Sequence, residues 1–184
     1  MIRAFVALDL DAASLAQVTR LSSALRGGAP ARAHFRWSDV AQMHLTSKFL
    51  GSVSEETIAA LAREVTALGH RAAPRSHTRS LTGFPSPQRA RVLVVELDDP
   101  SGALAGLASE LEVRAESFGV PRETRAYAPH VTLARARDPL ALSPWLDAVP
   151  FAPQPLRFEA LTLYQSDTTA TGAHYTALAR APFH

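Results

Sequence analysis

The sequence predicts an α+β fold with largely antiparallel sheets, helices on the outside and a cleft between two lobes. Short apolar runs with the alternation of strands are interleaved with amphipathic stretches that have the spacing of helices. Their order follows a strand–helix–strand–strand rhythm. Each half of the chain also contributes one long helix and one strand with the pattern His-x-Thr, at residues 44 and 130. These observations suggest a duplicated, bilobal architecture.

The first half of the chain predicts strands over residues 2–9, 33–37 and 43–50, with Gly51 ending the third. The first expected helix carries an apolar stripe of Leu15, Val18, Leu21 and Leu25. The second carries a stripe of Ile58, Leu61, Val65 and Leu68. We expect Gly27-Gly28 and Gly69 to end these helices, and Ser52 with Glu55 resembles a capping box.

The second half begins with a polar segment, residues 70–80, that we expect to form a loop leading into a strand near 77–83. Turn residues separate this strand from a second one at 90–97. A third helix is marked by Leu104, Leu107, Leu111 and Phe118 and ended by Gly119. The second His-x-Thr strand follows, then a Pro-rich region with a short helix or irregular structure, and closing strands near 156–164 and 173–180.

The length and composition of the chain exclude several classes of protein. At 184 residues the chain can build one compact domain or two small lobes that share a core. It has no cysteine, which excludes disulfides, thiolate metal sites and a cysteine nucleophile. No apolar stretch is long enough to cross a bilayer, and the first residues turn acidic too soon for a signal peptide. We therefore expect a cytoplasmic protein without membrane contact. The net charge is only +2, yet there are 18 arginines and one lysine.

Two tripeptides, His44-Leu45-Thr46 and His130-Val131-Thr132, carry the candidate chemistry. Alternate side chains of a strand share a face, so each histidine shares a face with its threonine. If the two strands are neighbours, two imidazoles and two hydroxyls converge. One imidazole can then take a proton while the other gives one, and the hydroxyls can bind phosphate oxygens. We expect no metal, because the histidines lack the spacing of a metal site and no paired carboxylates accompany them.

Three further residues are candidates for substrate contact. Arg135 lies near the end of the second motif strand and can pair with phosphate or stack on a base; a salt bridge at the rim is the alternative. Lys48 continues the alternating face of His44 and Thr46, unless it only extends to solvent from the strand end. Phe5 can stack on a nucleobase, although a core position is the more ordinary role for phenylalanine.

Residues 43–51, MHLTSKFLG, resemble the first signature of the 2H phosphoesterase superfamily, and residues 129–135, PHVTLAR, resemble the second. The resemblance points to the RNA 2′,3′-cyclic phosphodiesterase family, also called bacterial 2′-5′ RNA ligases. It extends to the opening strand, to Arg36-Trp37 and to the closing strands around residues 163–166 and 172–175. Ser47 stands where a leucine is usual. A third copy of the motif, at His174, falls on a late strand and is a coincidence in this alignment.

The resemblance implies hydrolysis of a 2′,3′-cyclic phosphate at an RNA end to a 2′-phosphate, with reversible 2′-5′ ligation as a further activity. It implies His44 as the acid toward the leaving oxygen and His130 as the base toward water. Thr46 and Thr132 would bind the non-bridging oxygens. No cofactor and no obligate protein partner are expected, and the protein is expected to be a monomer that binds RNA ends. Three alternatives stay open: a module that binds RNA ends without turnover, a metallohydrolase, and a phosphoesterase for another cyclic phosphate.

Overall fold

Two groups of antiparallel strands form the two lobes of the computed structural model, which describes residues 1–30, 33–169 and 172–184. The first lobe contains, in spatial order, β3 (His44–Val53), β1 (Ile2–Leu10), β7 (Pro155–Thr169) and β8 (Gly172–Pro182). The second contains β2 (Phe35–Trp37), β6 (His130–Leu140), β5 (Ala90–Leu97) and β4 (Arg75–Phe84). Every pairing in the described part of the chain is antiparallel, so the α+β prediction is confirmed.

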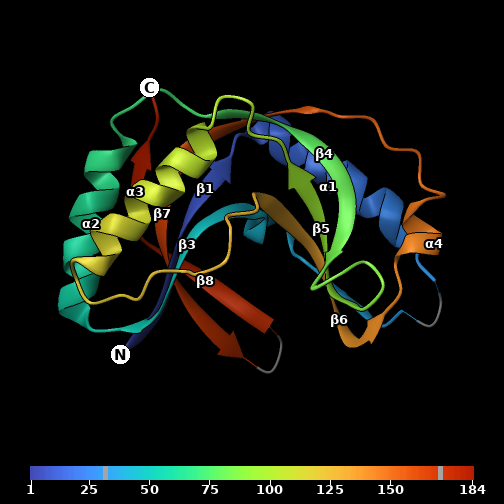
Figure 1. Ribbon diagram of the computed structural model, residues 1–184, viewed down its shortest axis with the longest axis horizontal. Helices are drawn as coiled ribbons and strands as arrows, with labels where there is room; N and C mark the ends of the chain where they lie inside the picture. Colours follow the sequence, from blue (N-terminus) through green and yellow to red (C-terminus); the bar gives the residue numbers. More distant parts are fainter. Residues whose placement is uncertain (31–32, 170–171) are drawn as a thin grey trace.

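Two short seams join the lobes. At one seam β3 pairs with β6, with Leu45 opposite Val131. At the other, residues 75–77 of β4 pair with residues 155–157 of β7. Because β7 also pairs with β1, the strands β1, β3, β6, β5, β4 and β7 close into a ring. The first seam lies in the middle of Figure 1, where β3 meets the second lobe.

Helices cover the outside of both lobes. α2 (Glu55–Gly69) and α3 (Ala103–Glu116) pack against one another on the first lobe, α2 against β7 and β8 and α3 against β3 (Figure 1). α1 (Ala12–Gly28) packs against β7 and β1, and its end approaches Trp145 of the short α4 (Ser143–Leu146), which packs against β4 (Figure 1). A single-turn helix, η1 (Val40–Gln42), immediately precedes β3. No helix within the described ranges is long and apolar enough to span a membrane.

Local sequence explains where the helices begin. The carboxylate of Asp11 caps α1 by accepting from the backbone N–H of Ser14 at 2.7 Å. Ser54 caps α2 by accepting from the N–H of Thr57 at 3.1 Å. The expected capping box of Ser52 with Glu55 is therefore wrong, because Ser52 still pairs with Arg3 in the β1–β3 ladder.

Strand pairing also moves several boundaries away from their predicted places. β3 continues through Gly51 to Val53, because its far end pairs with the start of β1. β4 begins at Arg75, inside the segment expected to be a loop, because residues 75–77 form the second seam with β7. At the end of α2, Gly69 lies so close to β8 that a Cβ would be 2.2 Å from the Cβ of Ala181. Glycine thus allows the helix to pack directly on the sheet.

The alternation of side chains separates a core face from an inner face. On β1, Val6 and Leu8 are fully buried in the hydrophobic core, so Phe5, Ala7 and Asp9 point the other way. On β5, Leu93, Val95 and Leu97 belong to the core, so Val92, Val94 and Glu96 face inward. The motif strands β3 and β6 lie between these two strands. Their histidines and threonines share the inner face.

Candidate active site

The structure brings the two His-x-Thr motifs together at the first seam. Leu45 lies opposite Val131 in antiparallel register, which sets His44 across from Thr132 and Thr46 across from His130. All four motif side chains are half-buried, whereas Leu45 and Val131 are fully buried beneath them. Two imidazoles and two hydroxyls from distant parts of the sequence therefore share one surface, as the sequence predicts.

Each imidazole is oriented by a backbone carbonyl two residues earlier in the chain. Nδ1 of His44 lies 2.7 Å from the carbonyl oxygen of Gln42, and Nδ1 of His130 lies 2.7 Å from that of Ala128. Because a carbonyl only accepts, both Nδ1 atoms carry the proton, and both Nε2 atoms are the ones left for chemistry. In His44 the Nε2 atom lies 3.0 Å from the hydroxyl of Thr46.

A β-bulge follows the threonine of each motif strand. In β3, Ala7 pairs with Thr46 and Val6 with Lys48, which leaves Ser47 as the extra residue. In β6, Val94 pairs with Thr132 and Leu93 with Ala134, which leaves Leu133 as the extra residue. A bulge reverses the alternation of the side chains beyond it. The residue five positions after each histidine is therefore exposed on the histidine face.

The bulge in β3 takes Lys48 off the face of His44 and Thr46, where simple alternation placed it, although Lys48 still lines a groove that also includes Thr46 and His130. Its contact with substrate stays a prediction. Lys48 pairs with the core residue Val6, is 4% exposed and points away from the face of His44 and Thr46. Its Nζ atom donates to Glu112 of α3 at 2.6 Å and to the carbonyl of Pro121 at 2.8 Å. The only lysine in the chain therefore holds α3 and the following loop against β3 through a buried ion pair.

The bulge in β6 turns Arg135 toward the histidines. Its side chain is exposed, and its positive charge lowers the pKa of both His44 and His130. Phe49 occupies the matching position in β3 and is 63% exposed. The sequence identified Arg135 but missed Phe49, because the alternation that is visible in the sequence does not reveal an inserted residue.

Aromatic rings surround His44. Phe5 stacks on its imidazole with ring centres 4.9 Å apart, and Tyr175 meets the imidazole edge-on at 5.5 Å. Tyr164 stacks against Phe5 at 5.4 Å. Phe5 is only 4% exposed, so the prediction that it stacks on a nucleobase is wrong. The face of the Phe5 ring already stacks on the imidazole of His44.

Burial is the largest influence on the pKa of His44 and lowers it to about 4. The Gln42 carbonyl and the negative charge of Asp9 act in the opposite direction, whereas His130 and Arg135 lower the pKa further. Burial also lowers the pKa of His130, whose ring meets Phe84 edge-on at 4.9 Å. Burial therefore favours the neutral form of both imidazoles.

A carboxylate on the neighbouring strand faces each histidine. Asp9 of β1 pairs with His44, and Glu96 of β5 pairs with His130. Each negative charge raises the pKa of its histidine. The sequence analysis missed both residues, although each is a lone acid within a strongly apolar strand, and such an acid needs a partner in the folded protein.

The two carboxylates differ in their own partners. Asp9 accepts hydrogen bonds from Thr162 at 2.6 Å, Tyr164 at 2.8 Å and Arg180 at 3.3 Å. Glu96 accepts from Ser80 at 2.6 Å. Asp9 is thus held by β7 and β8 in a network of three donors, whereas Glu96 is held by a single hydroxyl of β4.

Gln42 links His44 to the β7–β8 hairpin and was also missed. Its carbonyl orients the imidazole, while its side-chain amide donates to the carbonyl of Ala173 at 2.6 Å. The third motif copy lies on the same strand, but His174 itself is exposed and pairs in the ladder with Asp167. Its neighbour Tyr175 contacts His44 instead. No sequence pattern indicates this side-chain to backbone bond.

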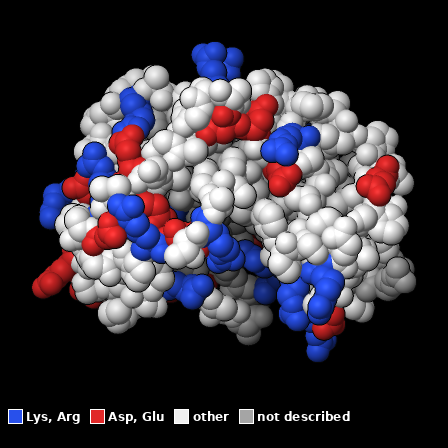
Figure 2. Space-filling model, in the orientation of Figure 1, with Lys and Arg blue, Asp and Glu red and all other residues white. Residues whose placement is uncertain are grey.

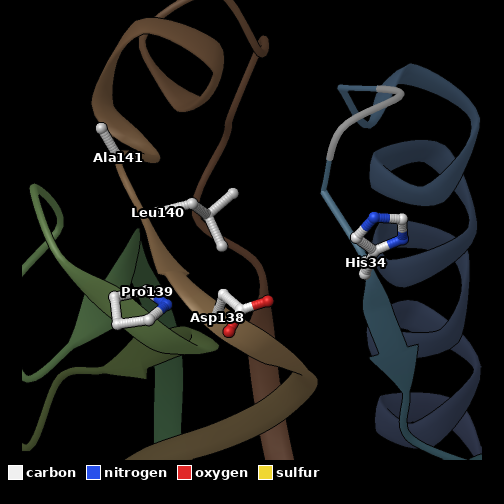
Figure 3. Close-up of a pocket in the computed structure, with 5 residues that line it drawn as sticks. All are labelled: His34, Asp138, Pro139, Leu140 and Ala141. Atoms are coloured by element: carbon white, nitrogen blue, oxygen red, sulfur yellow. The ribbon is translucent and has the colours of Figure 1, made fainter.

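A groove of about 780 Å³ opens beside Thr46 and His130. Its walls come from β3, the end of β4, α3 and the loop after α3, and its lining includes Phe49, Phe84, Glu112, Arg125 and Tyr127. A smaller hollow of about 330 Å³ lies elsewhere, between His34 and residues 138–141 (Figure 3). No motif residue lines the smaller hollow. Within the described ranges no three His, Asp or Glu side chains gather closely enough to hold a metal ion.

A bilobal α+β fold with paired His-x-Thr strands across a central seam defines the two-histidine, or 2H, phosphoesterases. A family model described as the 2′-5′ RNA ligase superfamily matches residues 9–170, and the chain belongs to this superfamily.

Relatives and solved structures agree with this assignment. An RNA 2′,3′-cyclic phosphodiesterase of Aeropyrum pernix is 34% identical over 94 residues, which is 51% of this chain and 53% of that protein. One of Methanothermobacter thermautotrophicus is 29% identical over 140 residues, covering 75% of this chain and 73% of that protein. The crystal structure of E. coli LigT complexed with 3′-AMP matches 99% of this chain and 98% of its own, with 26% identity and a TM-score of 0.75. The fold is also that of TT0787 of Thermus thermophilus, with 24% identity, a TM-score of 0.80, and 99% and 98% coverage.

Proposed function

We propose that this protein hydrolyses the 2′,3′-cyclic phosphate at the end of an RNA to a 2′-phosphate, without a metal or other cofactor. The convergence of His44, Thr46, His130 and Thr132 on one face is the observation that carries the proposal. The names of the two relatives and the nucleotide in the LigT structure support the substrate class. All four residues come from a single chain, so a monomer suffices for activity.

The reaction needs a base for the attacking water and an acid for the departing 3′ oxygen, on opposite sides of phosphorus. Two imidazoles on neighbouring strands can flank the phosphate in this way. The threonine hydroxyls are suited to donate to the non-bridging oxygens, where they would stabilise the negative charge that develops. If a 5′-hydroxyl attacks phosphorus in place of water, the same pair can form a 2′-5′ linkage while the bond to the 3′ oxygen breaks and that oxygen is protonated, which would be a 2′-5′ ligase activity.

We further propose that His44 is the base and His130 the acid, the reverse of the order that the family resemblance implies. His44 is the more strongly shifted histidine, with a pKa of about 4, and a neutral imidazole accepts a proton. The pKa of His130 is also lowered by burial, but the negative charge of Glu96 on the neighbouring strand opposes this shift, and we assign His130 as the acid that protonates the leaving oxygen. A bound phosphate offsets the positive charge of Arg135, so substrate binding raises both pKa values.

The test uses an oligoribonucleotide that ends in a 2′,3′-cyclic phosphate, incubated with excess EDTA and without nucleoside triphosphate. Chromatography against authentic 2′- and 3′-phosphate standards identifies the product. We expect the 2′-phosphate from the natural protein and from a His174→Ala control, and formation slower by about 10²–10⁴-fold from His44→Ala. A 3′-phosphate product contradicts the proposed chemistry. Binding without turnover identifies a binding module, and activity lost in EDTA but restored by Zn²⁺ identifies a metallohydrolase.

A further inference from the structure

Two arginines lie opposite each other on the inner face, next to the motif residues. Arg36 of β2 is the direct ladder partner of Arg135 of β6. Phe35 and Trp37 pack against the hydrophobic core, so the intervening Arg36 points to the inner face. Arg135 is turned to the same face by the bulge after Thr132. The pair therefore adjoins the place where a phosphate would contact the two histidines.

Like charges directly opposite one another in a sheet are destabilising unless an anion lies between or beside them. Neither Arg36 nor Arg135 forms an ion pair with a carboxylate in the part of the chain that the structure describes. Guanidinium groups are the preferred protein ligands for phosphate oxygens. Figure 2 shows Lys and Arg side chains along the hollow between the lobes. The pair thus has the charge and the geometry to bind an anion.

The side chain of Arg36 lies against the β7–β8 hairpin. A Cβ atom on Gly172 would lie 2.3 Å from a terminal nitrogen of Arg36, so the guanidinium fits directly against the backbone of this glycine. Gly172 has φ 145°, a conformation that residues with a Cβ rarely adopt. The same hairpin end is fixed by the hydrogen bond from Gln42 to Ala173. The guanidinium of Arg36 therefore lies at the end of the β7–β8 hairpin, beside the site.

We propose that Arg36 and Arg135 form a second anion subsite, which binds the phosphodiester that precedes the terminal nucleoside of the substrate. Arg135 follows Thr132 by three residues that include the bulge, or roughly 7–10 Å along the strand. Neighbouring phosphates of a single strand can span this separation. The inference rests on the proposed function and specifies its substrate class. The substrate is an oligonucleotide, and a mononucleoside cyclic phosphate leaves the subsite empty.

The experiment compares two dinucleotides that end in a 2′,3′-cyclic phosphate. One has a natural phosphodiester between its nucleosides and the other a neutral methylphosphonate. For the natural protein we expect kcat/KM to be about 10- to 100-fold higher with the charged linkage, the range expected for a hydrogen bond to a charged group. In Arg36→Gln this ratio falls toward one. Arg20→Gln, which removes the same charge from the outside of α1, keeps the natural ratio.

Equal kcat/KM values for the two linkages in the natural protein, or an unchanged ratio in Arg36→Gln, overturn the subsite. Equilibrium binding of the matching 2′-phosphate dinucleotides separates this outcome from failure of the proposed function, because binding needs no turnover. If nothing is hydrolysed but the charged dinucleotide still binds more tightly through Arg36, the function is wrong and the subsite stands. The slope of log K against log salt should also decrease in magnitude by about 0.7 in Arg36→Gln.

Discussion

The strand that carries His44 and the strand that carries His130 have the same local structure but different neighbours. Over six residues from each histidine the two strands share one pattern of burial, with a bulge after the threonine. Each imidazole donates to a carbonyl two residues earlier. The position after the bulge, however, holds Phe49 in one lobe and Arg135 in the other.

The side chains that surround the two histidines also differ. His44 is enclosed by aromatic rings and faces a carboxylate that three donors already hold. His130 faces Glu96, which a single hydroxyl holds. One backbone arrangement thus supplies the same imidazole geometry twice, and the neighbouring side chains give the two imidazoles different surroundings. Such a difference is what a base and an acid in one site require.

The largest expected effect comes from removing either imidazole. His44→Ala and His130→Ala should each lower kcat by about 10²–10⁴-fold, and the double variant should be little worse than either, since the two act as a unit. A substrate with sulfur at the 3′ bridging position separates their roles, because a thiolate leaves without protonation.

We expect the sulfur substrate to restore much of the rate in His130→Ala and little in His44→Ala, measured as kcat relative to the natural protein. His174→Ala serves as the control and should keep its rate with both substrates. If the sulfur substrate instead restores the rate only in His44→Ala, then His44 is the acid and His130 the base, as the family resemblance implies.

A smaller effect should follow from neutralising the two carboxylates. In Glu96→Gln the pKa of His130 falls, so the acid loses its proton earlier and the alkaline limb of the kcat/KM profile moves to lower pH. At pH 7 the rate should drop by about three- to tenfold, since one pKa unit corresponds to a factor of ten. Asp9→Asn should move the acidic limb of the profile to lower pH and change the rate at pH 7 less.

Asp9→Asn should instead lower the free energy of unfolding by about 1–3 kcal/mol, because three donors lose their charged acceptor. Glu96→Gln disturbs one such bond and should be the milder change in denaturant melts. Equal shifts of the same pH limb in both variants would show that the two carboxylates do not act on separate histidines.

The smallest effect concerns stability as a function of pH. The pKa of His44 is about 4 in the folded protein and near 6.5 in an unfolded chain, so the unfolded state binds the proton more readily. The contribution of His44 to the free energy of unfolding is therefore fully present above pH 6.5 and decreases as the pH falls toward 4. The melting temperature should fall by several degrees over this range, and by less in His44→Asn than in a His174→Asn control. Equal pH dependence in both variants would contradict the assigned shift.

The sequence predicted the parts of the site that depend on strand alternation alone. His44 and Thr46 share a face because they are two positions apart in a strand, and the same holds for His130 and Thr132. Lys48 was misplaced because a bulge is a property of two paired strands and leaves no mark in one of them. Phe5 was placed on the correct face, but the sequence could not show that His44 would cover its ring.

Residues that act across long sequence separations could not be found in this way. Asp9 and Glu96 gain their importance from ladder partners 35 and 34 residues away, and the register of a ladder is set by the whole sheet. Gln42 reaches Ala173 across 131 residues. The capping error at Ser52 has the same origin, because a residue that can begin a helix was already paired in a strand.

The narrow seam between Leu45 and Val131 has a mechanical consequence. The two imidazoles belong to different lobes, which pair at this seam through Leu45 and Val131 and at the second seam through β4 and β7. The relative orientation of the two lobes therefore sets the separation of the rings. An anion that binds residues of both lobes therefore links them, and we expect the molecule to be most rigid when its ligand is bound.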